Sequence, residues 1–492
     1  MSRRAAALVG AAAAEVALSH APGADGAEAR PAATIDCSVA DTRIEVTADA
    51  ELDPGCTYTA GIDVTASDVT LDCRGARIVG APGAGGRGIE VRTPVDVAMA
   101  GVTVRNCQVE GFLNSLRVTR DGFRDLAPGE EFLTPTSDIV VEGSTFSGSR
   151  GVGVYVDGWV SGVTIAGNTI RGAGSSGIYL EGGSRENVVV DNDIVDNGFV
   201  ENGPDGRRIT IGGTDVWFWG VGREGISVDG SSANLIEGNR FAGNSAGGVF
   251  LYKNCGEYPD SGRYFDRRDP SNGNVIRANA FDGGRYGVWV ASRMGENTLP
   301  MECTDPAYVD DGVRRVVLDH AEDNTVADNA FDGVTYGIVV EDDGTTVSGN
   351  RFTADAPDHH AVIVGTPDRT EVLGRPVTGT VLRGNEADIV GNDSPYRWVH
   401  GIEDTTDEAN LALGEPSALC EGEPLPRLPF IFTIAAAPAP ADGSTPPTPD
   451  LTVETLGALP SCRTASPASP TAPAAPAAPA ARPVAGQAAY TG

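Results

Sequence analysis

The chain has 492 residues, 64 of them glycine, with 6% aromatic residues and a formal net charge of −32. A charge of this sign and size argues against nucleic acid or an anionic membrane surface as a partner. It also opposes binding of a polyanion unless local basic residues or a bridging cation overcome the field. No stretch beyond the N-terminus approaches the roughly 18 consecutive apolar residues of a membrane span.

The N-terminus has the features of an export signal, which we assign to residues 1–29. Arg3 and Arg4 supply the basic start, residues 5–14 the apolar run, and residues 27–29 a small-x-small cleavage motif. We therefore expect a secreted, extracellular protein.

Eight cysteines in an exported chain predict disulfides, since their number is even and no C-x-x-C metal motif occurs. The order of the cysteines leaves other connectivities open. The pairing that best fits neighbouring coils and shared insertions is Cys37–Cys56, Cys73–Cys107, Cys255–Cys303 and Cys420–Cys462.

The strongest pattern in the chain is a repeat with a base period near 21–24 residues, lengthened where segments are inserted. Its anchor is an asparagine followed two residues later by Ile or Phe. The anchors are Asn168, Asn192, Asn239, Asn279, Asn329 and Asn350. After each anchor a glycine opens a second short strand. Examples of these strands are 177–180, 225–228, 287–290 and 337–340.

Short strands repeating at this period stack in parallel, because one coil cannot bury its apolar side chains alone. The expected fold class is all-β, a single-stranded right-handed parallel β-helix with loop insertions. We place this domain at residues 34–432 and a Pro/Ala-rich, largely disordered tail at 433–492. Three insertions interrupt the coils. They span 199–223, 255–273 and 294–323.

The segment Val69–Ala76 and the two repeat motifs resemble the pectate-lyase-like superfamily of right-handed parallel β-helices, over roughly residues 35 to 400. That resemblance is specific for fold. It is less informative about activity, because this scaffold carries lyases, epimerases, hydrolases and non-enzymatic adhesins.

Aligning the strands opened by glycine predicts two columns of side chains that point away from the coil interior. The first column reads Tyr155, Tyr179, Ser227, Phe250, Trp289 and Val339. The second column reads Asp157, Glu181, Asp229, Tyr252, Ala291 and Glu341. Aromatic rings beside carboxylates suit a sugar chain lying in an exposed groove. The expected substrate contacts are Tyr155, Tyr179, Phe250, Trp289, Trp217, Trp219 and Asp157.

Lys253 is the sole lysine beside 35 arginines, which suggests a role for an amine that can lose its proton. The preferred hypothesis is a polysaccharide lyase or epimerase that removes the α-proton of a uronic acid, with Lys253 as base. Arg293 or Arg223 stabilises charge or donates a proton, and Tyr252 is a further candidate. This set of roles resembles the lysine-and-arginine polysaccharide lyases. In those enzymes calcium neutralises the substrate carboxylate, which suggests Glu181, Glu224 and Asp229 as calcium ligands.

Two alternatives stay open. One is a glycoside hydrolase with paired carboxylates, either Glu181 with Asp229 or Asp157 with Asp229. The other is a carbohydrate-binding or structural surface protein without turnover. In every case the expected partner is a polysaccharide, and a monomer is expected.

Overall fold

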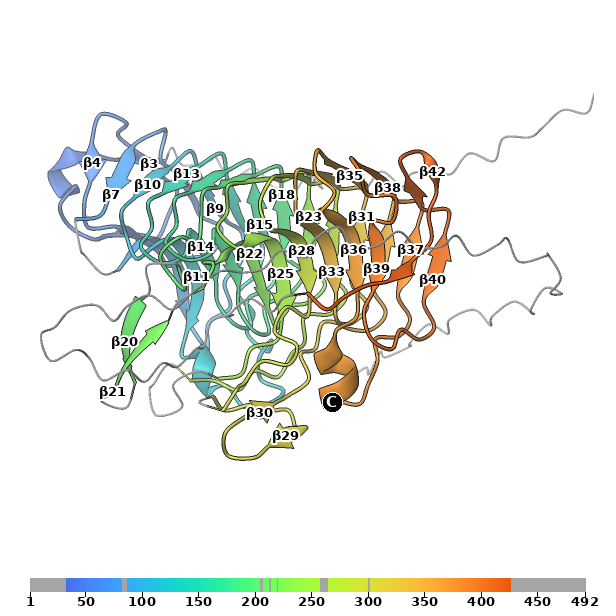
Figure 1. Ribbon diagram of the computed structural model, residues 1–492. Helices are drawn as coiled ribbons and strands as arrows, with labels where there is room; N and C mark the ends of the chain where they lie inside the picture. The colour runs from blue at the N-terminus through green and yellow to red at the C-terminus, as the bar shows by residue number, and fades with distance from the viewer. Residues whose placement is uncertain are drawn as a thin grey trace, which may run out of the picture.

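The computed structural model describes residues 32–81, 86–203, 207–211, 214–218, 220–256, 264–299 and 301–425, with backbone only for 207–211 and 214–218. Within these residues the chain winds into a β-helix whose coils stack side by side from the N-terminal to the C-terminal end (Figure 1). The expected export signal and tail lie outside the described residues. None of the described helices is long and apolar enough to cross a membrane.

Each regular coil gives one strand to each of three parallel sheets, and each sheet has 13 strands in the described part of the chain. The first sheet contains, in order, β1 (Ala33–Ile35), β3 (Ala50–Leu52), β6 (Thr70–Asp72), β9 (Val102–Arg105), β12 (Ile139–Glu142), β15 (Val163–Ala166), β18 (Val188–Val190), β23 (Leu235–Glu237), β26 (Val275–Arg277), β31 (Thr325–Ala327), β34 (Thr346–Ser348), β37 (Val381–Arg383) and β40 (Thr406–Glu408).

The second sheet contains β4 (Thr57–Tyr58), β7 (Arg77–Val79), β10 (Gln108–Glu110), β13 (Thr145–Ser147), β16 (Thr169–Arg171), β19 (Asp193–Val195), β24 (Arg240–Ala242), β27 (Ala280–Asp282), β32 (Ala330–Asp332), β35 (Arg351–Ala354), β38 (Glu386–Ile389), β41 (Leu411–Ala412) and β42 (Glu415–Pro416). Its last pair, β41 with β42, is antiparallel.

The third sheet contains β2 (Ile44–Val46), β5 (Ile62–Val64), β8 (Arg87–Pro94), β11 (Asn114–Asp121), β14 (Val154–Val156), β17 (Ile178–Leu180), β22 (Glu224–Asp229), β25 (Gly247–Tyr252), β28 (Tyr286–Val290), β33 (Tyr336–Val340), β36 (His360–Val364), β39 (Tyr396–Trp398) and β43 (Cys420–Glu421).

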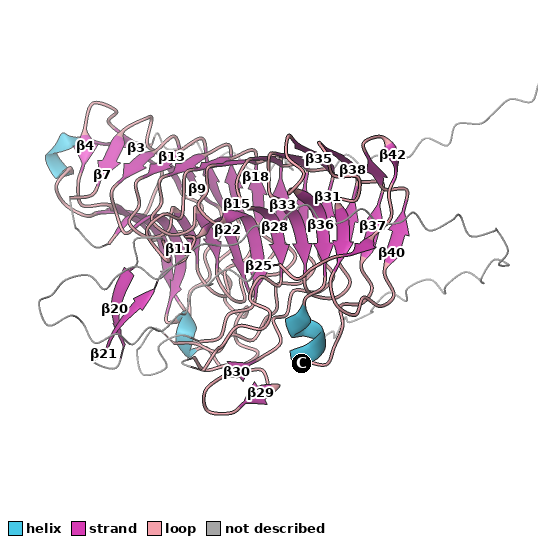
Figure 2. Ribbon diagram, viewed as in Figure 1, coloured by secondary structure: helices cyan, strands magenta, loops and turns pink. Residues whose placement is uncertain are grey.

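The remaining elements lie outside the coils. They are two antiparallel hairpins, β20 (Arg207–Ile211) with β21 (Thr214–Phe218) and β29 (Val309–Asp310) with β30 (Arg315–Val316), and three short helical turns, η1 (Cys37–Val39), η2 (Phe123–Asp125) and η3 (Asp368–Val372). Figure 2 shows both hairpins and two of the helical turns gathered along one side of the coil stack.

The predicted asparagine anchors form a hydrogen-bonded ladder at the bend between the first and second sheets. The amide Nδ2 of Asn192 donates to Oδ1 of Asn239 at 2.9 Å, and Asn239 donates in turn to Asn279 at 3.0 Å. These amides are buried, so each bond satisfies a polar group that water cannot reach. Beside the ladder, Phe241 and Phe281 stack with ring centroids 4.7 Å apart.

Three disulfides confirm three of the predicted pairs, namely Cys37–Cys56, Cys73–Cys107 and Cys255–Cys303. For the fourth predicted pair, Cys462 lies outside the described residues. The Cys255–Cys303 bridge joins two insertions beside the third sheet, and two backbone hydrogen bonds between Gly256 and Glu302 run next to it.

Candidate functional site

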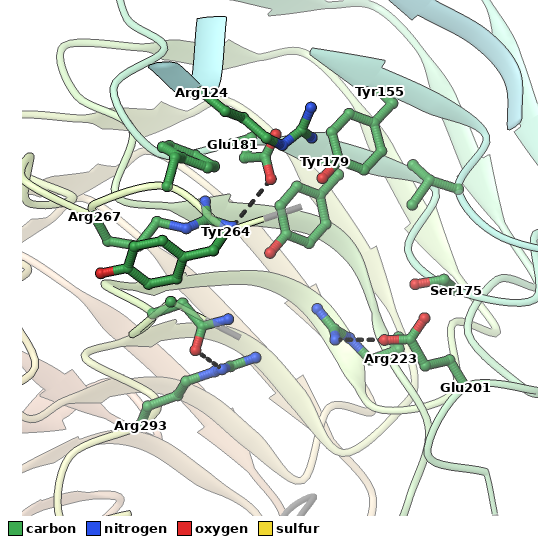
Figure 3. A pocket seen from close by; sticks show the side chains of 14 residues that line it. Arg124, Tyr155, Ser175, Tyr179, Glu181, Glu201, Arg223, Tyr264, Arg267 and Arg293 are labelled. Atoms are coloured by element: carbon green, nitrogen blue, oxygen red, sulfur yellow. Dashed lines mark hydrogen bonds and ion pairs between the residues drawn. The ribbon is translucent and has the colours of Figure 1, made fainter. Parts of the chain in front are cut away.

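A cavity of about 250 Å³ lies on the outer face of the third sheet, lined by side chains of β14 and β17 and of loops that leave the coils (Figure 3). It is lined by Arg124, Val152, Tyr155, Ser175, Tyr179, Glu181, Glu201, Arg223, Asn254, Gly256, Tyr264, Phe265, Arg267 and Arg293. The lining is mostly polar and includes four arginines, against two glutamates. A chain of −32 net charge thus gathers cationic groups at this one place.

Two tyrosines on neighbouring coils form one wall of the cavity. Tyr155 of β14 pairs in register with Tyr179 of β17, and their rings stack with centroids 5.1 Å apart. The Tyr179 hydroxyl donates to Oδ2 of Asp229 at 2.7 Å. Burial, followed by nearby carboxylates, raises the pKa of both phenols well above the ordinary value, so they stay protonated at neutral pH.

Arg267 enters from the insertion and joins two carboxyl groups of the third sheet. Its Nη2 lies 3.0 Å from Oε1 of Glu181, and its Nη1 lies 3.3 Å from Oδ2 of Asp229. Burial raises the pKa of Glu181, although Arg267 opposes the shift. The second oxygen of Glu181, Oε2, is buried and makes no hydrogen bond of ordinary geometry within the described residues. The Tyr155 hydroxyl is a neighbour that favours the charged form of Glu181.

Arg223 lies on the other side of the stacked tyrosines and is held by several polar groups. It contacts Glu201 and Glu224, each at 3.0 Å, and donates to the Tyr252 hydroxyl at 2.8 Å. Burial alone would raise the pKa of Glu224, but the Arg223 charge and hydrogen bonds to the carboxylate lower it. Glu224 is therefore an ionised partner that fixes the guanidinium of Arg223.

Arg293 completes the cationic side of the cavity. Its guanidinium carbon lies 4.2 Å from the centre of the Tyr252 ring, and its Nη1 donates to the side chain of Asn254. Tyr252 is buried between Arg223 and Arg293 without lining the cavity, and burial raises its pKa. Of the predicted catalytic residues, Arg223 and Arg293 reach the cavity and Tyr252 supports them.

The side chain of Lys253 does not lie where it was predicted. Its ammonium group lies 2.6 Å from Oδ2 of Asp305, and only 6% of the side chain is exposed. It does not line the cavity. Its backbone N–H donates to Asp319. The hypothesis placed Lys253 in an open groove. Instead the chain leaves β25 at this point, so the side chain meets the insertion that carries Asp305.

The first predicted column is correct in register but not in exposure. Tyr179 pairs with Ser227, Ser227 with Phe250, and Phe250 with Trp289. Beyond the cavity, however, this face is covered, and its side chains pack into a second apolar group, the outer cluster. The outer cluster consists of Ala246, Phe250, Tyr252, Tyr286, Trp289, Tyr336, Val339, Ile363 and Val399, with Val221 and Leu425 packed against it.

Phe250 and Trp289 are therefore at most 3% exposed and do not line the cavity, in contrast to their predicted role. Asp157 is also fully buried, held by Arg117 and Thr119. The side chain of Trp217 and all of Trp219 lie outside the described residues. Of the predicted substrate contacts, Tyr155 and Tyr179 line the cavity.

The three carboxylates predicted to bind calcium are each paired with an arginine. Glu181 and Asp229 share Arg267, and Glu224 contacts Arg223. Calcium requires six to eight oxygen ligands, and these cations occupy the space around the carboxylates. Paired in this way, the three carboxylates do not fit a calcium site. The calcium dependence of activity stays a prediction.

Several cavity residues were not predicted as site residues, because the loops and insertions that carry them have no repeat that would place them. They are Arg124, Glu201, Asn254, Tyr264, Phe265 and Arg267. The available signal was the density of arginine and aromatic residues in 263–268.

Comparison with a family model supports the architecture. A family model described as a right handed beta helix region matches residues 55–216 and 207–368. The A-module of mannuronan C-5 epimerase AlgE4 from Azotobacter vinelandii is 14% identical, with a TM-score of 0.41, over 78% of this chain and 88% of that chain.

Two further solved structures show similarity to this chain. The catalytic domain of a GH87 alpha-1,3-glucanase is 12% identical, with a TM-score of 0.44, over 77% of this chain and 63% of that chain. An alginate lyase from Paenibacillus sp. str. FPU-7 is 12% identical, with a TM-score of 0.34, over 78% of this chain and 99% of that chain. A search of curated proteins finds no match.

Proposed function

The chain belongs to the right-handed beta helix family, and we propose that its cavity is a carbohydrate site for a uronic-acid-containing polymer. The proposed reaction is α-proton abstraction, leading to elimination or epimerisation. Since this fold hosts many activities, the proposal depends on the site and not on the scaffold.

The observation that carries the proposal is the stacked tyrosine pair facing arginines in one cavity. Each ring covers one face of the other, so the pair offers ring edges and hydroxyl groups to a sugar ring. Arginine suits a carboxylate because its planar guanidinium presents several donors in a fixed geometry. Glu224 and Asn254 hold Arg223 and Arg293 in place before a ligand arrives.

Glu181 is the proposed base in place of Lys253, because it lines the cavity and its raised pKa makes its carboxylate a stronger proton acceptor. Glu181 takes the proton on the carbon beside the uronate carboxylate. The electron pair moves into that carboxylate, where the arginines stabilise the added charge.

Elimination then re-forms the carboxylate, makes a carbon–carbon double bond and breaks the bond to the leaving glycosidic oxygen. A tyrosine phenol gives its proton to that oxygen, and the raised pKa of Tyr155 and Tyr179 keeps both phenols protonated for this step. In epimerisation the same carbanion regains a proton on the opposite face.

The test is a panel of uronate polymers followed by the ultraviolet absorbance of the unsaturated product, and by proton exchange with deuterated water for epimerisation. Glu181→Gln should lower the rate by about 10²–10⁴-fold, the usual contribution of one acid–base group. Glu186→Gln is the matched control, because that side chain is exposed in the same connection between β17 and β18. Full activity of Glu181→Gln would remove Glu181 from the mechanism.

Hydrolysis is a second candidate, favoured by the position of two glutamates. Glu181 and Glu201 both line the cavity and lie on opposite sides of the tyrosine pair (Figure 3). Glu181 with its raised pKa would be the acid, and Glu201 the base or nucleophile. The two carboxylate pairs expected from the sequence both include Asp229, one with Glu181 and one with Asp157. They are disfavoured because Asp157 and Asp229 are fully buried. New reducing ends without the unsaturated product would favour this reaction.

Secretion is part of the same proposal, and it is supported by three disulfides, which persist in oxidising compartments. Mass spectrometry of protein from the culture medium should find a mature N-terminus near residue 30. Intact residues 1–29 on protein retained inside the cell would contradict it.

A further inference from the structure

The outer face of the third sheet is apolar on one side of the cavity and polar on the other. Toward the C-terminal coils it is filled by the outer cluster. Phe250, Tyr286 and Trp289 pack edge to face or tilted there with centroids 4.4 to 5.8 Å apart, and each is at most 3% exposed. A sugar chain lying along the sheet therefore meets a packed apolar wall on this side.

Toward the N-terminal coils the same face is polar and partly open. Arg117 pairs in register with Tyr155, and Glu90 with Arg117, so they continue the column that forms the cavity wall. Arg92, two residues after Glu90, is 39% exposed and contacts Asp121 at 3.1 Å. Arg117 and Glu90 are nearly buried and paired with each other, so the exposed Arg92 is the group that offers donors to sugar hydroxyls or carboxylates here.

The cavity itself has room for little more than one ring. Its volume of about 250 Å³ is below the ~300–1,000 Å³ of pockets that enclose drug-sized ligands. The tyrosine pair spans two strands, which lie ~4.8 Å apart in a sheet. That spacing is comparable to the length of one pyranose ring.

We propose that the cavity takes the terminal unit of an acidic polysaccharide, and that the rest of the chain leaves across β11 and β8 toward the N-terminal end. The protein then acts from chain ends and not within the chain. This inference rests on the proposed function and adds the position on the polymer at which it acts.

The test compares the size of the polymer with the amount of product during the reaction. End-directed action releases small products from the start while the mean polymer length and the viscosity fall slowly. A polymer whose terminal units are chemically blocked at both ends should react at less than about a tenth of the rate. For epimerisation, deuterium from the solvent should appear first in the terminal unit.

The outcomes separate the two proposals. Rapid loss of viscosity, or equal rates on blocked and unblocked polymer, overturns end-directed action and leaves the uronate activity standing. Absence of turnover on every uronate polymer, together with no binding of uronate oligosaccharides by calorimetry, removes the proposed function and this inference with it. If uronate oligosaccharides bind but do not react, the binding experiment with Arg92→Ala still tests the proposed path of the polymer.

The Arg92→Ala variant tests the direction in which the polysaccharide leaves the cavity. It should weaken the binding of a uronate tetrasaccharide by about fivefold, the size of one exposed charged contact, and leave binding of the single sugar acid unchanged. Arg351→Ala is the matched control, since it removes an exposed arginine from the second sheet. Equal affinity of the Arg92→Ala variant and the native protein for the tetrasaccharide would overturn the proposed path.

Discussion

Lys253 has a structural role that its sequence position did not reveal. Its ion pair with Asp305 fastens one insertion to the strand end that carries Asn254, and the Cys255–Cys303 bridge lies two residues away. Thr304, next to Asp305, donates to the backbone carbonyl of Arg267. The lysine therefore supports the wall of the cavity through the insertion.

A pair of substitutions at Lys253 distinguishes support from catalysis. Lys253→Arg keeps a cation near Asp305, so we expect activity within about tenfold of the native protein. Lys253→Met removes the pair and should destabilise the protein by about 1–3 kcal/mol, since a partly buried carboxylate is left without its cation. Thermal unfolding and steady-state kinetics measure the two effects. Complete loss of activity in a folded Lys253→Arg variant would restore the lysine as base.

Asp319 predicts the pH dependence of stability. It is fully buried, and burial raises its pKa from 3.8 to about 7, although the N–H groups of Lys253 and Arg293 oppose the shift. The folded state holds this proton more tightly than the unfolded state. The stabilisation that Asp319 contributes is therefore fully present below pH 3.8 and is lost as the pH rises to about 7.

We therefore expect the Tm of the native protein to fall relative to that of Asp319→Asn as the pH rises through this window. Asp332→Asn, at an exposed aspartate on β32, should show no such trend. If the difference in Tm between the native protein and Asp319→Asn stays constant with pH, Asp319 does not titrate between pH 3.8 and about 7.

At the scale of elements, the asparagine ladder predicts how strongly neighbouring coils depend on one another. Asn239→Ala leaves the backbone N–H of Asn192 without its acceptor and removes one of the three acceptors of the Asn192 side-chain amide. We expect a loss of about 2–4 kcal/mol in the free energy of unfolding, because each buried polar group left unsatisfied costs about 1–3 kcal/mol. Denaturant unfolding measures it.

The neighbouring Arg240→Ala variant is the control for this experiment. Arg240 lies on the same coil, and its ion pairs with Asp193 and Asp282 are about half exposed, so its loss should cost about 0–1 kcal/mol. Equal losses in both variants would mean that the ladder contributes no more than a surface ion pair.

The strands and their register were predictable because the repeat is local. A glycine two residues before Tyr155 and Tyr179 fixes which side chains point outward, and parallel stacking then aligns them. Exposure was not predictable, because it depends on loops from other coils. Phe250 occupies the predicted column, yet it is buried by segments whose course no repeat specifies.

The same reason limited prediction of the site. Tyr179 and Arg223 could be named because they lie on or next to repeating strands. Arg267 reaches Glu181 across 86 positions of the sequence from an irregular insertion, and no spacing rule connects the two. Calcium was suggested by the resemblance to lysine-and-arginine lyases and by the presence of carboxylates, whereas the structure places guanidinium groups against those carboxylates.

For the whole molecule, the net charge of −32 opposes the approach of an acidic polymer, although the cavity is lined with arginine. Salt screens exposed charges over ~10 Å at 0.1 M and screens buried contacts less. We expect the association rate of an anionic oligosaccharide to rise as salt is added and then level off. Stopped-flow measurement of this rate tests the prediction. A steady fall with salt, as nucleic-acid binding shows, would indicate that attraction dominates at long range.

The stacking of coils also sets the order in which parts of the nascent chain fold. Coils bearing Arg124, Tyr155 and Tyr179 can settle on those before them while later residues are still being synthesised. The cavity closes only after Arg293 and Cys303 have been added. An interrupted chain ending before that point would be a solenoid without the closed cavity, so formation of the proposed site waits until synthesis has passed Cys303.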